Sequence, residues 1–476
     1  MGTPMYEFFL EFGAYCFENC PWDVTINAST LVRSGVIGPR HGSEARSLPS
    51  TLRRLGGVEW MLFRTLLRRA RLQAELVGDD ATVLGFVPFN RSDYVGLVRP
   101  YLDVITDSGV RCAVAVPGTS AGQWVEFASR NGSAVTFIEA GASPATYRDG
   151  RRTLAALRPA LRDAADKFRL SSSAKHGLTA FFAQFAFQKA LASRIIERIA
   201  PQVVVGLHFV STRGWQAAID GTRTLGHKPR VVLVQHGTFE ESTGFHDFEG
   251  ADLVMLWGER WQRELERFAS LPFRHVPAAV VTGNPKYDGV GRRGDQRAGE
   301  SLNGHRQHRC TRVLYVSSHE AGRTMRGPLA MTVQAAKSEP GLEIVVKPHP
   351  AERDGTLKAL VESGQLRAES VLAPRHPLRD CILEADVVVG PRSTALFEAA
   401  WLGKPVVLLS EGPGPAFEGF LTVTDALALH AIIDRLVNDA SWRASVVARQ
   451  VDALEDAFGT TEGSVRAGAE QIARLL

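Results

Sequence analysis

Short apolar runs alternate with longer amphipathic stretches along most of this 476-residue chain. Between residues 82 and 282 the runs are rich in valine and bounded by glycine, proline or charged residues, a pattern typical of buried strands. Strands that alternate with helices form right-handed βαβ units and a parallel sheet, so we expect an α/β domain here. The predicted strands lie at residues 82–89, 111–116, 134–139, 203–207, 230–235, 252–257 and 279–282.

The alternation stops at residues 289–311, which are polar and rich in glycine and arginine. This composition is typical of a linker between domains. A second series of apolar runs follows at residues 312–317, 343–347, 370–372, 386–389 and 405–409. Because the chain is too long for one ordinary core, the pattern predicts two doubly wound α/β domains that face a cleft.

Helical segments flank and interrupt these two domains. Residues 144–168 and 175–199 are long for crossover helices and predict a helical insertion in the first domain. The tail has helical periodicity throughout. We therefore expect a helical N-terminal extension, a first α/β domain, a linker, a second α/β domain and C-terminal helices at residues 1–80, 81–288, 289–311, 312–423 and 424–476.

Residues 51–76 form a basic amphipathic stretch in which arginines alternate with leucines and aromatic residues. Such a helix can lie on an anionic membrane, with its apolar face in the lipid. It can equally pack on the protein with its arginines in solvent. Gly56 and Gly57 interrupt the start of the stretch and favour packing on the protein.

The composition narrows the class of protein. With 45% hydrophobic and 22% charged residues the chain is globular, and its net charge of +4 is too small to predict a nucleic-acid partner. Five scattered cysteines give no disulfide framework or zinc spacing, which favours a reducing compartment. No apolar run is long enough to span a membrane, and Glu7 and Glu11 stand where a signal peptide carries basic residues. A cytoplasmic protein is expected.

Two hydroxyl residues follow one of the strands predicted in the second domain. Ser393 and Thr394 come after Val387–Gly390, at the N-cap and first turn of a predicted helix. Ligands of open parallel sheets bind outside the carboxyl ends of the strands, and a helix N-terminus there favours phosphate. Glu398 lies one turn further along, within reach of ribose hydroxyls. An ordinary helix cap is the alternative.

Other polar groups follow neighbouring strands of the same predicted domain. Lys347 and His349 lie in a Lys-Pro-His-Pro turn directly after a strand, where two prolines restrict the backbone. A cation and an imidazole in a rigid turn can stabilise a leaving phosphate. Ser317 and Ser318 follow the first strand and can offer hydroxyl and N–H groups to the same phosphate. A turn histidine without function is the alternative.

A second histidine closes a strand of the first domain. His236 follows Val231–Gln235, and an imidazole with a pKa near neutrality is suited to accept a proton from a hydroxyl. A structural histidine that caps the strand is the alternative. The loop after it holds further candidates for contact with an acceptor, at Gly237, Thr238, Glu240 and Asp247. The carboxylates of this loop compete with His236 for the role of base. Since no Asp-x-Asp pair follows a strand, a metal is not required. No other cofactor is expected.

The order of these motifs resembles bacterial surface-polysaccharide transferases of the GT-B fold. This group includes polysialyltransferase-like, capsule-synthesis and teichoic-acid glycerophosphotransferase enzymes, and the non-hydrolysing UDP-N-acetylglucosamine 2-epimerases share the fold. The resemblance covers about residues 200–410 and rests on His236-Gly237-Thr238, Lys347-Pro348-His349-Pro350, Ser393-Thr394 with Glu398, and Gly403-Lys404-Pro405.

The resemblance implies two Rossmann-like domains and a role for each motif. His236 would act near the acceptor, His349 with Ser393 and Thr394 would hold the nucleotide phosphate, and Glu398 would bind the ribose. The loop at residues 410–419 is unlike that of the epimerases. Gly390-Pro391-Arg392-Ser393-Thr394 stands where the glycerophosphotransferases carry an Asp-Tyr-Ser-Ser run. Both departures favour a glycosyltransferase.

The sequence therefore predicts an enzyme that moves a sugar from a nucleotide sugar to a cell-surface glycan or glycolipid, without a metal. It is expected in the cytoplasm, with contact to the inner membrane face left open. Three alternatives also remain open. They are a 2-epimerase, a CDP-glycerol-type glycerophosphotransferase, and a non-catalytic sugar-nucleotide-binding partner of another transferase.

Overall fold

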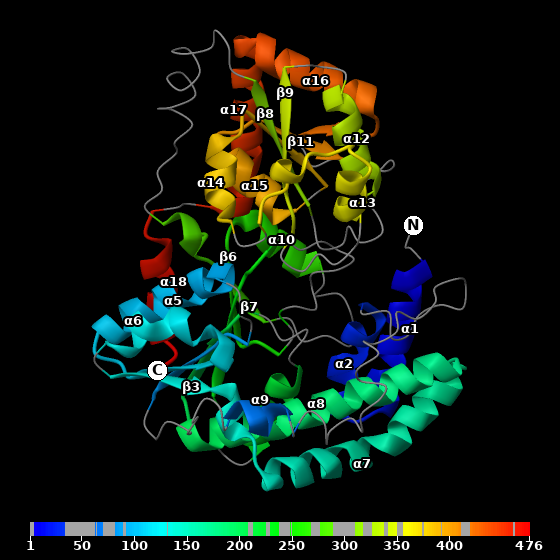
Figure 1. Cartoon of the computed structure of the whole chain (residues 1–476). Helices are drawn as coiled ribbons and strands as arrows, with labels where there is room; N and C mark the ends of the chain where they lie inside the picture. Colours follow the sequence, from blue (N-terminus) through cyan, green and yellow to red (C-terminus); the bar gives the residue numbers. More distant parts are fainter. Residues whose placement is uncertain are drawn as a thin grey trace. The chain divides into compact units, whose positions relative to one another are not determined.

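The structure is a computed structural model, and it divides the chain into two compact units, each described by itself. Unit 1 comprises Met1–Asp288 and Gly463–Leu476, and unit 2 comprises Gly289–Glu462 (Figure 1). The residues described are 4–33, 62, 64–69, 81–88, 92–130, 132–207, 213–224, 229–237, 248, 250–267, 277–288, 310–317, 326–337, 341–349, 356–373, 376–391, 393–410, 419–459 and 462–476.

Unit 1 is built on a parallel sheet that has seven strands among its described residues, in the order β3-β2-β1-β4-β5-β6-β7. The strands are β1 (Val83–Phe86), β2 (Cys112–Val116), β3 (Ser133–Phe137), β4 (Val203–Gly206), β5 (Arg230–Val234), β6 (Leu253–Leu256) and β7 (Ala278–Val281). The strand order reverses direction between β1 and β4, which are buried along their whole length. This reversal is the topological switch point of a doubly wound sheet.

Helices cover both faces of this sheet, as the sequence predicts. They are α5 (Ser92–Asp107), η1 (Gly118–Trp124), α6 (Val125–Ala128), η2 (Ile138–Gly141), α9 (Arg213–Thr224), α10 (Glu259–Arg267), η5 (Pro285–Tyr287) and α18 (Ser464–Ala473). The last of these returns from the far end of the chain. The Asp288 carboxylate accepts hydrogen bonds from the backbone N–H groups of Gly463 and Val465, at 2.8 and 2.9 Å. Gly468 packs against Tyr101, where a Cβ atom would lie 2.3 Å from the ring.

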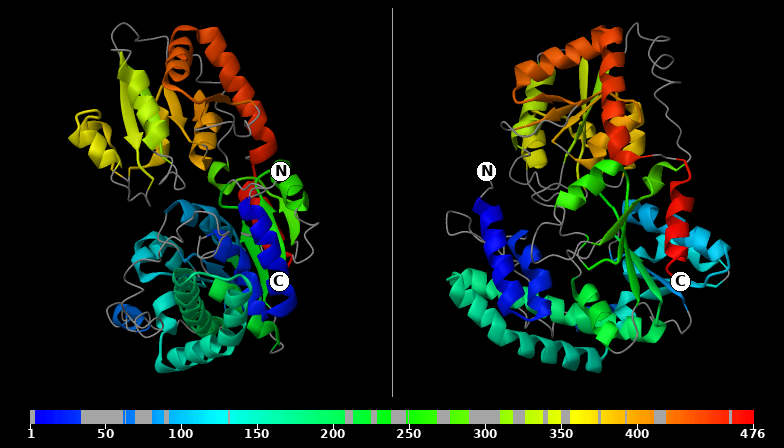
Figure 2. Two further views of the ribbon diagram at one scale, coloured as in Figure 1. Left: turned by 90° about the vertical axis from the view of Figure 1, so that its right-hand side faces the viewer. Right: turned by 180° about the vertical axis from the view of Figure 1, so that it is seen from behind.

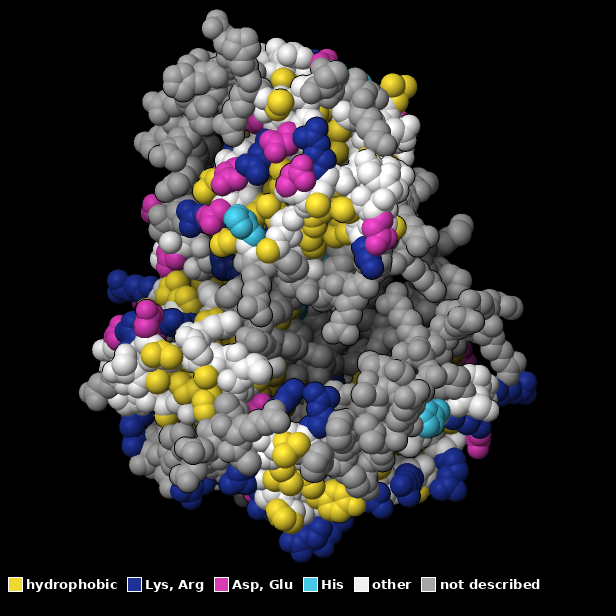
Figure 3. Space-filling model, viewed as in Figure 1, with side chains coloured by type: hydrophobic (Ala, Val, Ile, Leu, Met, Phe, Trp, Pro, Cys, Tyr) yellow, Lys and Arg dark blue, Asp and Glu magenta, His cyan; other side chains and the backbone are white. Residues whose placement is uncertain are grey.

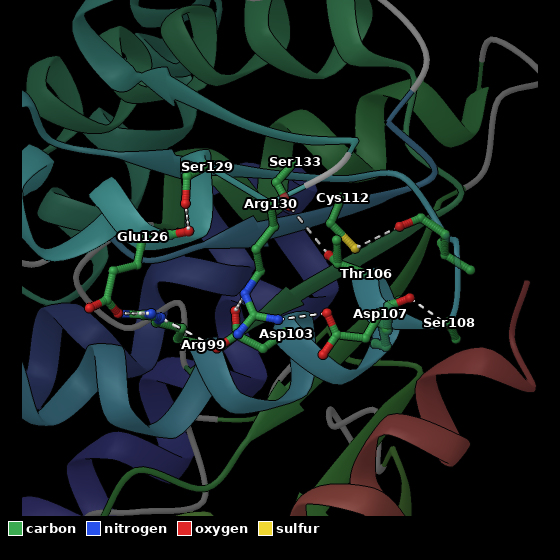
Figure 4. A network of polar contacts seen from close by, with 12 residues as sticks. Arg99, Asp103, Thr106, Asp107, Ser108, Cys112, Glu126, Ser129, Arg130 and Ser133 are labelled. Atoms are coloured by element: carbon green, nitrogen blue, oxygen red, sulfur yellow. Dashed lines mark hydrogen bonds and ion pairs between the residues drawn. The ribbon is translucent and has the colours of Figure 1, made fainter.

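A polar network fastens α6 to α5 (Figure 4). Arg130 pairs with Asp103 and Asp107, and Arg99 pairs with Asp103 and with Glu126 of α6. Burial raises the pKa of Asp103, and the two arginines oppose this shift. The network lies along the second half of α5, so it holds α6 and the turn after it against that helix.

The predicted helical insertion is present as a long hairpin of α7 (Pro144–Lys167) and α8 (Ser172–Ile199). The helices α1 (Pro4–Asn19) and α2 (Trp22–Arg33) pack against it (Figures 1 and 2). Phe12 and Cys16 of α1 share a core with Leu157 of α7 and Phe182 of α8. This core is separate from the sheet and explains why two helices of this length are stable as crossovers.

Unit 2 contains a second parallel sheet, of five strands among its described residues, in the order β12-β11-β10-β8-β9. The strands are β8 (Thr311–Val316), β9 (Leu342–Lys347), β10 (Val387–Gly390), β11 (Val406–Leu409) and β12 (Leu421–Val423). The helices are α12 (Arg326–Lys337), α13 (Thr356–Glu362), η7 (Ala368–Ser370), α14 (Leu378–Glu384), α15 (Thr394–Trp401), α16 (Ala426–Asn438) and α17 (Ala440–Phe458). They lie on both faces of the sheet (Figure 1), so the prediction of two doubly wound parallel α/β domains is confirmed.

Unit 2 departs from the predicted strands at one place. The run 370–372 makes only a single bridge, between Val371 and Val346. The fifth strand is instead β12, at the edge of the sheet. The helical tail is also divided, because α16 and α17 belong to unit 2 whereas α18 belongs to unit 1. Residues 289–309 of the predicted linker lie outside the described residues.

Candidate functional site

Three neighbouring strands of unit 2 end at the same level of the sheet. β8 lies between β10 and β9, with Val316 opposite Lys347 and Tyr315 opposite Val389. The chain passes from β8 to β9 on one side and then crosses to β10 on the other, so the strand order reverses between β8 and β10. A crevice outside the carboxyl ends of the strands forms at such a reversal, and ligands of α/β sheets bind there.

Gly390 ends β10 where the backbones of two strands approach closely. A Cβ atom at this position would lie 2.4 Å from the carbonyl oxygen of Val316 in β8, so no other residue fits without movement of the backbone. The chain then turns through Pro391 into α15. The absence of a side chain therefore keeps the carboxyl ends of β8 and β10 close together.

Ser393 occupies the N-cap position of α15, in extended backbone, but its side chain makes no capping hydrogen bond. The hydroxyl oxygen is buried and has no hydrogen-bond partner among the described residues. Thr394 follows as the first residue of the helix, and Glu398 is half-buried one turn later. A helix start with its N–H groups and a buried hydroxyl is suited to an anion such as phosphate.

Ser317 and the turn after β9 form the other side of this edge. The Ser317 hydroxyl accepts a hydrogen bond of 2.7 Å from the backbone N–H of His349, and the Ser317 N–H donates to the Lys347 carbonyl at 3.1 Å. Ser317 is buried and so fixes the Lys-Pro-His turn from the neighbouring strand. This contact places His349, which is half-buried, beside the end of β8.

Lys347 is itself buried, at 5% exposure. Burial lowers the pKa of its ammonium group, and the nearby Cys381 thiol group opposes the shift. Burial destabilises the charged form of a lysine, and a negatively charged ligand nearby stabilises it. Of the residues predicted for this site, the structure brings together Ser317, Lys347 and His349 on one side and Ser393, Thr394 and Glu398 on the other. Ser318 lies outside the described residues.

In unit 1, His236 follows the end of β5, and the residue before it determines its position. The Gln235 side chain is fully buried. Its Oε1 accepts a hydrogen bond from the backbone N–H of Trp257 at 2.9 Å, and its Nε2 donates to the carbonyl of Gly237 at 2.9 Å. One side chain therefore ties both sides of the His236 turn to the end of β6.

The Tyr94 ring, from the first turn of α5, meets the His236 ring edge-on, with 5.7 Å between ring centroids. α5 follows β1, so this contact joins the end of β5 to the switch point of the unit 1 sheet. Sequence reasoning missed both Gln235 and Tyr94. The one local signal was a glutamine at the end of an otherwise apolar run. The predicted loop candidates Thr238, Glu240 and Asp247 lie outside the described residues.

The described part of the chain bears on two further kinds of site, for metal ions and for a membrane span. No group of three or more His, Cys, Asp or Glu side chains is placed there to hold a metal ion. No helix within the described ranges has both the length and the apolar character that crossing a bilayer requires.

Comparison with known proteins identifies the fold. No protein-family model matches the sequence, and no curated protein matches it. Among solved structures, UDP-GlcNAc 2-epimerase from Neisseria meningitidis bound to UDP-GlcNAc is similar, with 11% identity, 83% of this chain and 98% of that chain covered, and a TM-score of 0.51. A protein from Listeria monocytogenes assigned as a UDP-N-acetylglucosamine 2-epimerase matches with 11% identity, 81% and 94% coverage, and a TM-score of 0.50. At such identity the likeness shows the fold, two parallel-sheet α/β domains of the GT-B kind.

Proposed function

We propose that the protein is a glycosyltransferase that uses a nucleotide sugar as donor and a cell-surface glycan or glycolipid as acceptor. The main support for this proposal is that β10, β8 and β9 end side by side at the switch point of the unit 2 sheet. Those three ends supply a buried hydroxyl at a helix start, a buried lysine and a fixed histidine. These groups together suit the phosphate of a nucleotide.

The donor would bind to unit 2 through distinct groups. The phosphate would accept hydrogen bonds from the start of α15, from the hydroxyls of Ser393 and Thr394, and from His349, with Lys347 balancing its charge. Glu398 would accept hydrogen bonds from the ribose hydroxyls. The groups that contact the phosphate are stronger partners for a departing phosphate than for a neutral leaving group, so they would stabilise the transition state of transfer.

The reaction would be a direct displacement at the sugar. An acceptor hydroxyl attacks the anomeric carbon, the bond from that carbon to the phosphate oxygen breaks, and the nucleotide leaves with the electron pair. His236 would take the proton of the acceptor hydroxyl. Its placement by Gln235 and Tyr94 supports a fixed orientation of the imidazole, which a general base needs.

The donor class is tested by a thermal-shift screen with CMP, CDP, UDP and GDP, followed by calorimetry of the best ligand. His349→Ala should raise the dissociation constant of that ligand about tenfold or more, since a hydrogen bond to a charged group contributes roughly 1.5–3 kcal/mol to binding. His176→Ala, at an exposed histidine of α8 in unit 1, is the matched control and should bind as the wild type does. Equal nucleotide affinity of His349→Ala and the control would refute the phosphate assignment.

The reaction type needs a second experiment. His236→Ala should keep nucleotide affinity and lose sugar transfer to an acceptor. Incubation of the wild type with nucleotide sugars alone separates the alternatives. Epimerisation of the sugar without an acceptor would replace the proposal by a 2-epimerase, and transfer from CDP-glycerol by a glycerophosphotransferase. Tight binding with no turnover against any acceptor would indicate a non-catalytic sugar-nucleotide-binding protein.

A further inference from the structure

The helical hairpin of unit 1 carries an excess of positive charge. Residues 144–199 contain eleven Lys or Arg and four Asp or Glu, a net charge of +7, against +4 for the whole chain. The remaining residues together are therefore net negative, so the insertion carries more than the whole net positive charge of the protein. The predicted donor and acceptor sites lie elsewhere, at strand ends, so they give no reason for this distribution.

The charge lies on the outer face of α7. Its buried residues recur along one side of the helix and include Leu154, Leu157 and Leu161. Five exposed arginines fall on the opposite side, within an arc of about 120° at the helical spacing of 100° per residue. They are Arg148, Arg151, Arg152, Arg158 and Arg162. The first and last of them are about 21 Å apart at 1.5 Å per residue.

Only part of this charge is neutralised within the described residues. Asp149 pairs with Arg152 and with Arg194 of α8, and Asp166 pairs with Lys175. By contrast, Arg148, Arg158 and Arg162 make no ion pair with any other residue that the structure describes. Figure 3 shows Lys and Arg side chains in a row along the edge of unit 1 that α7 forms.

A second basic segment lies at the start of the same helix. Arg69 donates a hydrogen bond of 2.6 Å to the carbonyl of Ala142, directly before the N-cap of α7. This helical segment belongs to the stretch 51–76, of which the structure describes residue 62 and residues 64–69. Leu66 packs against the hairpin core, while Leu67 is 42% exposed and lies between the exposed residues Arg64 and Arg68.

We infer that the outer face of α7, together with residues 64–69, binds the surface of an anionic lipid bilayer. The side chains exposed between the arginines are small or apolar, namely Ala155, Ala156, Pro159 and Leu67. Basic side chains with interspersed apolar groups suit a headgroup layer. The described part of this face carries no exposed aromatic ring on which nucleic-acid bases could stack. The inference does not depend on the proposed transferase activity.

Vesicle sedimentation tests this inference on the full-length protein. Wild-type protein should sediment with vesicles of phosphatidylcholine containing about a third phosphatidylglycerol, stay in solution with phosphatidylcholine alone, and be released by salt. The variant Arg148→Glu/Arg158→Glu/Arg162→Glu should lose more than about a hundredfold in partition coefficient, since each basic side chain near the surface contributes about fivefold. The triple Arg→Lys variant at the same positions should bind as the wild type does.

The matched control reverses the charge of three exposed arginines outside this face, in the variant Arg367→Glu/Arg449→Glu/Arg474→Glu. Its net charge changes by the same amount as that of the α7 variant. It should retain vesicle binding. Thermal unfolding of each variant shows whether it is folded. The inference is overturned if the two Glu variants lose binding equally, or if the α7 variant binds as the wild type does. It is also overturned if the wild type prefers double-stranded DNA to anionic vesicles in competition.

Discussion

Two glycines with the same local sequence allow a sharp test of the unit 2 site. Val203-Val204-Val205-Gly206 ends β4 and Val387-Val388-Val389-Gly390 ends β10, and each strand lies at the switch point of its sheet. In Gly390→Ala the new Cβ atom would lie 2.4 Å from the Val316 carbonyl oxygen, a backbone atom that cannot move alone. In Gly206→Ala it would lie 3.4 Å from the Phe86 carbonyl oxygen, an ordinary contact.

Overpacking of this kind costs roughly 1–3 kcal/mol, because β10 and β8 must separate where they end. That range corresponds to an increase of about fivefold to more than a hundredfold in the equilibrium constant for local opening of the strand pair. Hydrogen–deuterium exchange followed by mass spectrometry measures it directly, in peptides that cover β8 and β10. Gly206→Ala is the control and should leave exchange of β1 and β4 almost unchanged. Equal protection of the strand pair in Gly390→Ala and in the wild type would show that the two strand ends do not need a glycine here.

Three further predictions concern unit 1. Gln235→Leu should destabilise unit 1 by roughly 1–3 kcal/mol, since it leaves the buried N–H of Trp257 without its acceptor; thermal unfolding measures this, and an unchanged midpoint would contradict it. Asp288→Ala removes the acceptor at the start of α18 and should cost roughly 0.5–2 kcal/mol, with faster proteolysis of the C-terminal helix as the readout. A hydrogen bond from Cys16 lowers the pKa of Cys20, whereas the pKa of Cys16 is raised by the same bond and by burial. As pH rises, alkylation should therefore modify Cys20 first, and Cys16→Ala should move its labelling midpoint to higher pH; labelling of both thiols at one midpoint would contradict this.

The sheet strands were largely predictable because a buried parallel strand needs a continuous apolar run, and such runs stand out between glycines and charged residues. The exception lies at an edge. Val371 and Leu372 look like a strand but make only one bridge, whereas Leu421–Val423 pairs with β11 although Thr422 is exposed. An edge strand is buried on fewer sides, so its sequence need not be a continuous apolar run. Whether such a segment forms a strand then depends on pairing with the neighbouring strand of the sheet.

The candidate site was predictable as far as local sequence determines it. His236, His349 and Ser393 each follow an apolar run, and the topology then places the second and third on either side of β8, at the same edge of one sheet. The contacts that hold the histidines were not predictable, because Ser317 reaches His349 across 32 residues and Gln235 reaches Trp257 across 22. Partners at that separation leave no periodic pattern in the sequence.

Long-range contacts also explain the division of the chain. The helices described after residue 424 have similar periodicity, yet among them only α18 belongs to unit 1. Its position depends on Asp288 and on the close approach of Gly468 to Tyr101. Neither contact can be read from the amphipathic pattern of α18, which fixes only that one face of the helix is buried.

We propose that the edge formed by β10, β8 and β9 holds the phosphate of a nucleotide. Hydrogen–deuterium exchange with a saturating nucleoside diphosphate, chosen by the thermal-shift screen, tests it most directly. We expect slower exchange in peptides that cover Val316–Ser317, Lys347–His349 and the first turn of α15 from Thr394, relative to the protein alone. Protection confined to other parts of the chain, with these three segments unchanged under saturating ligand, would contradict it.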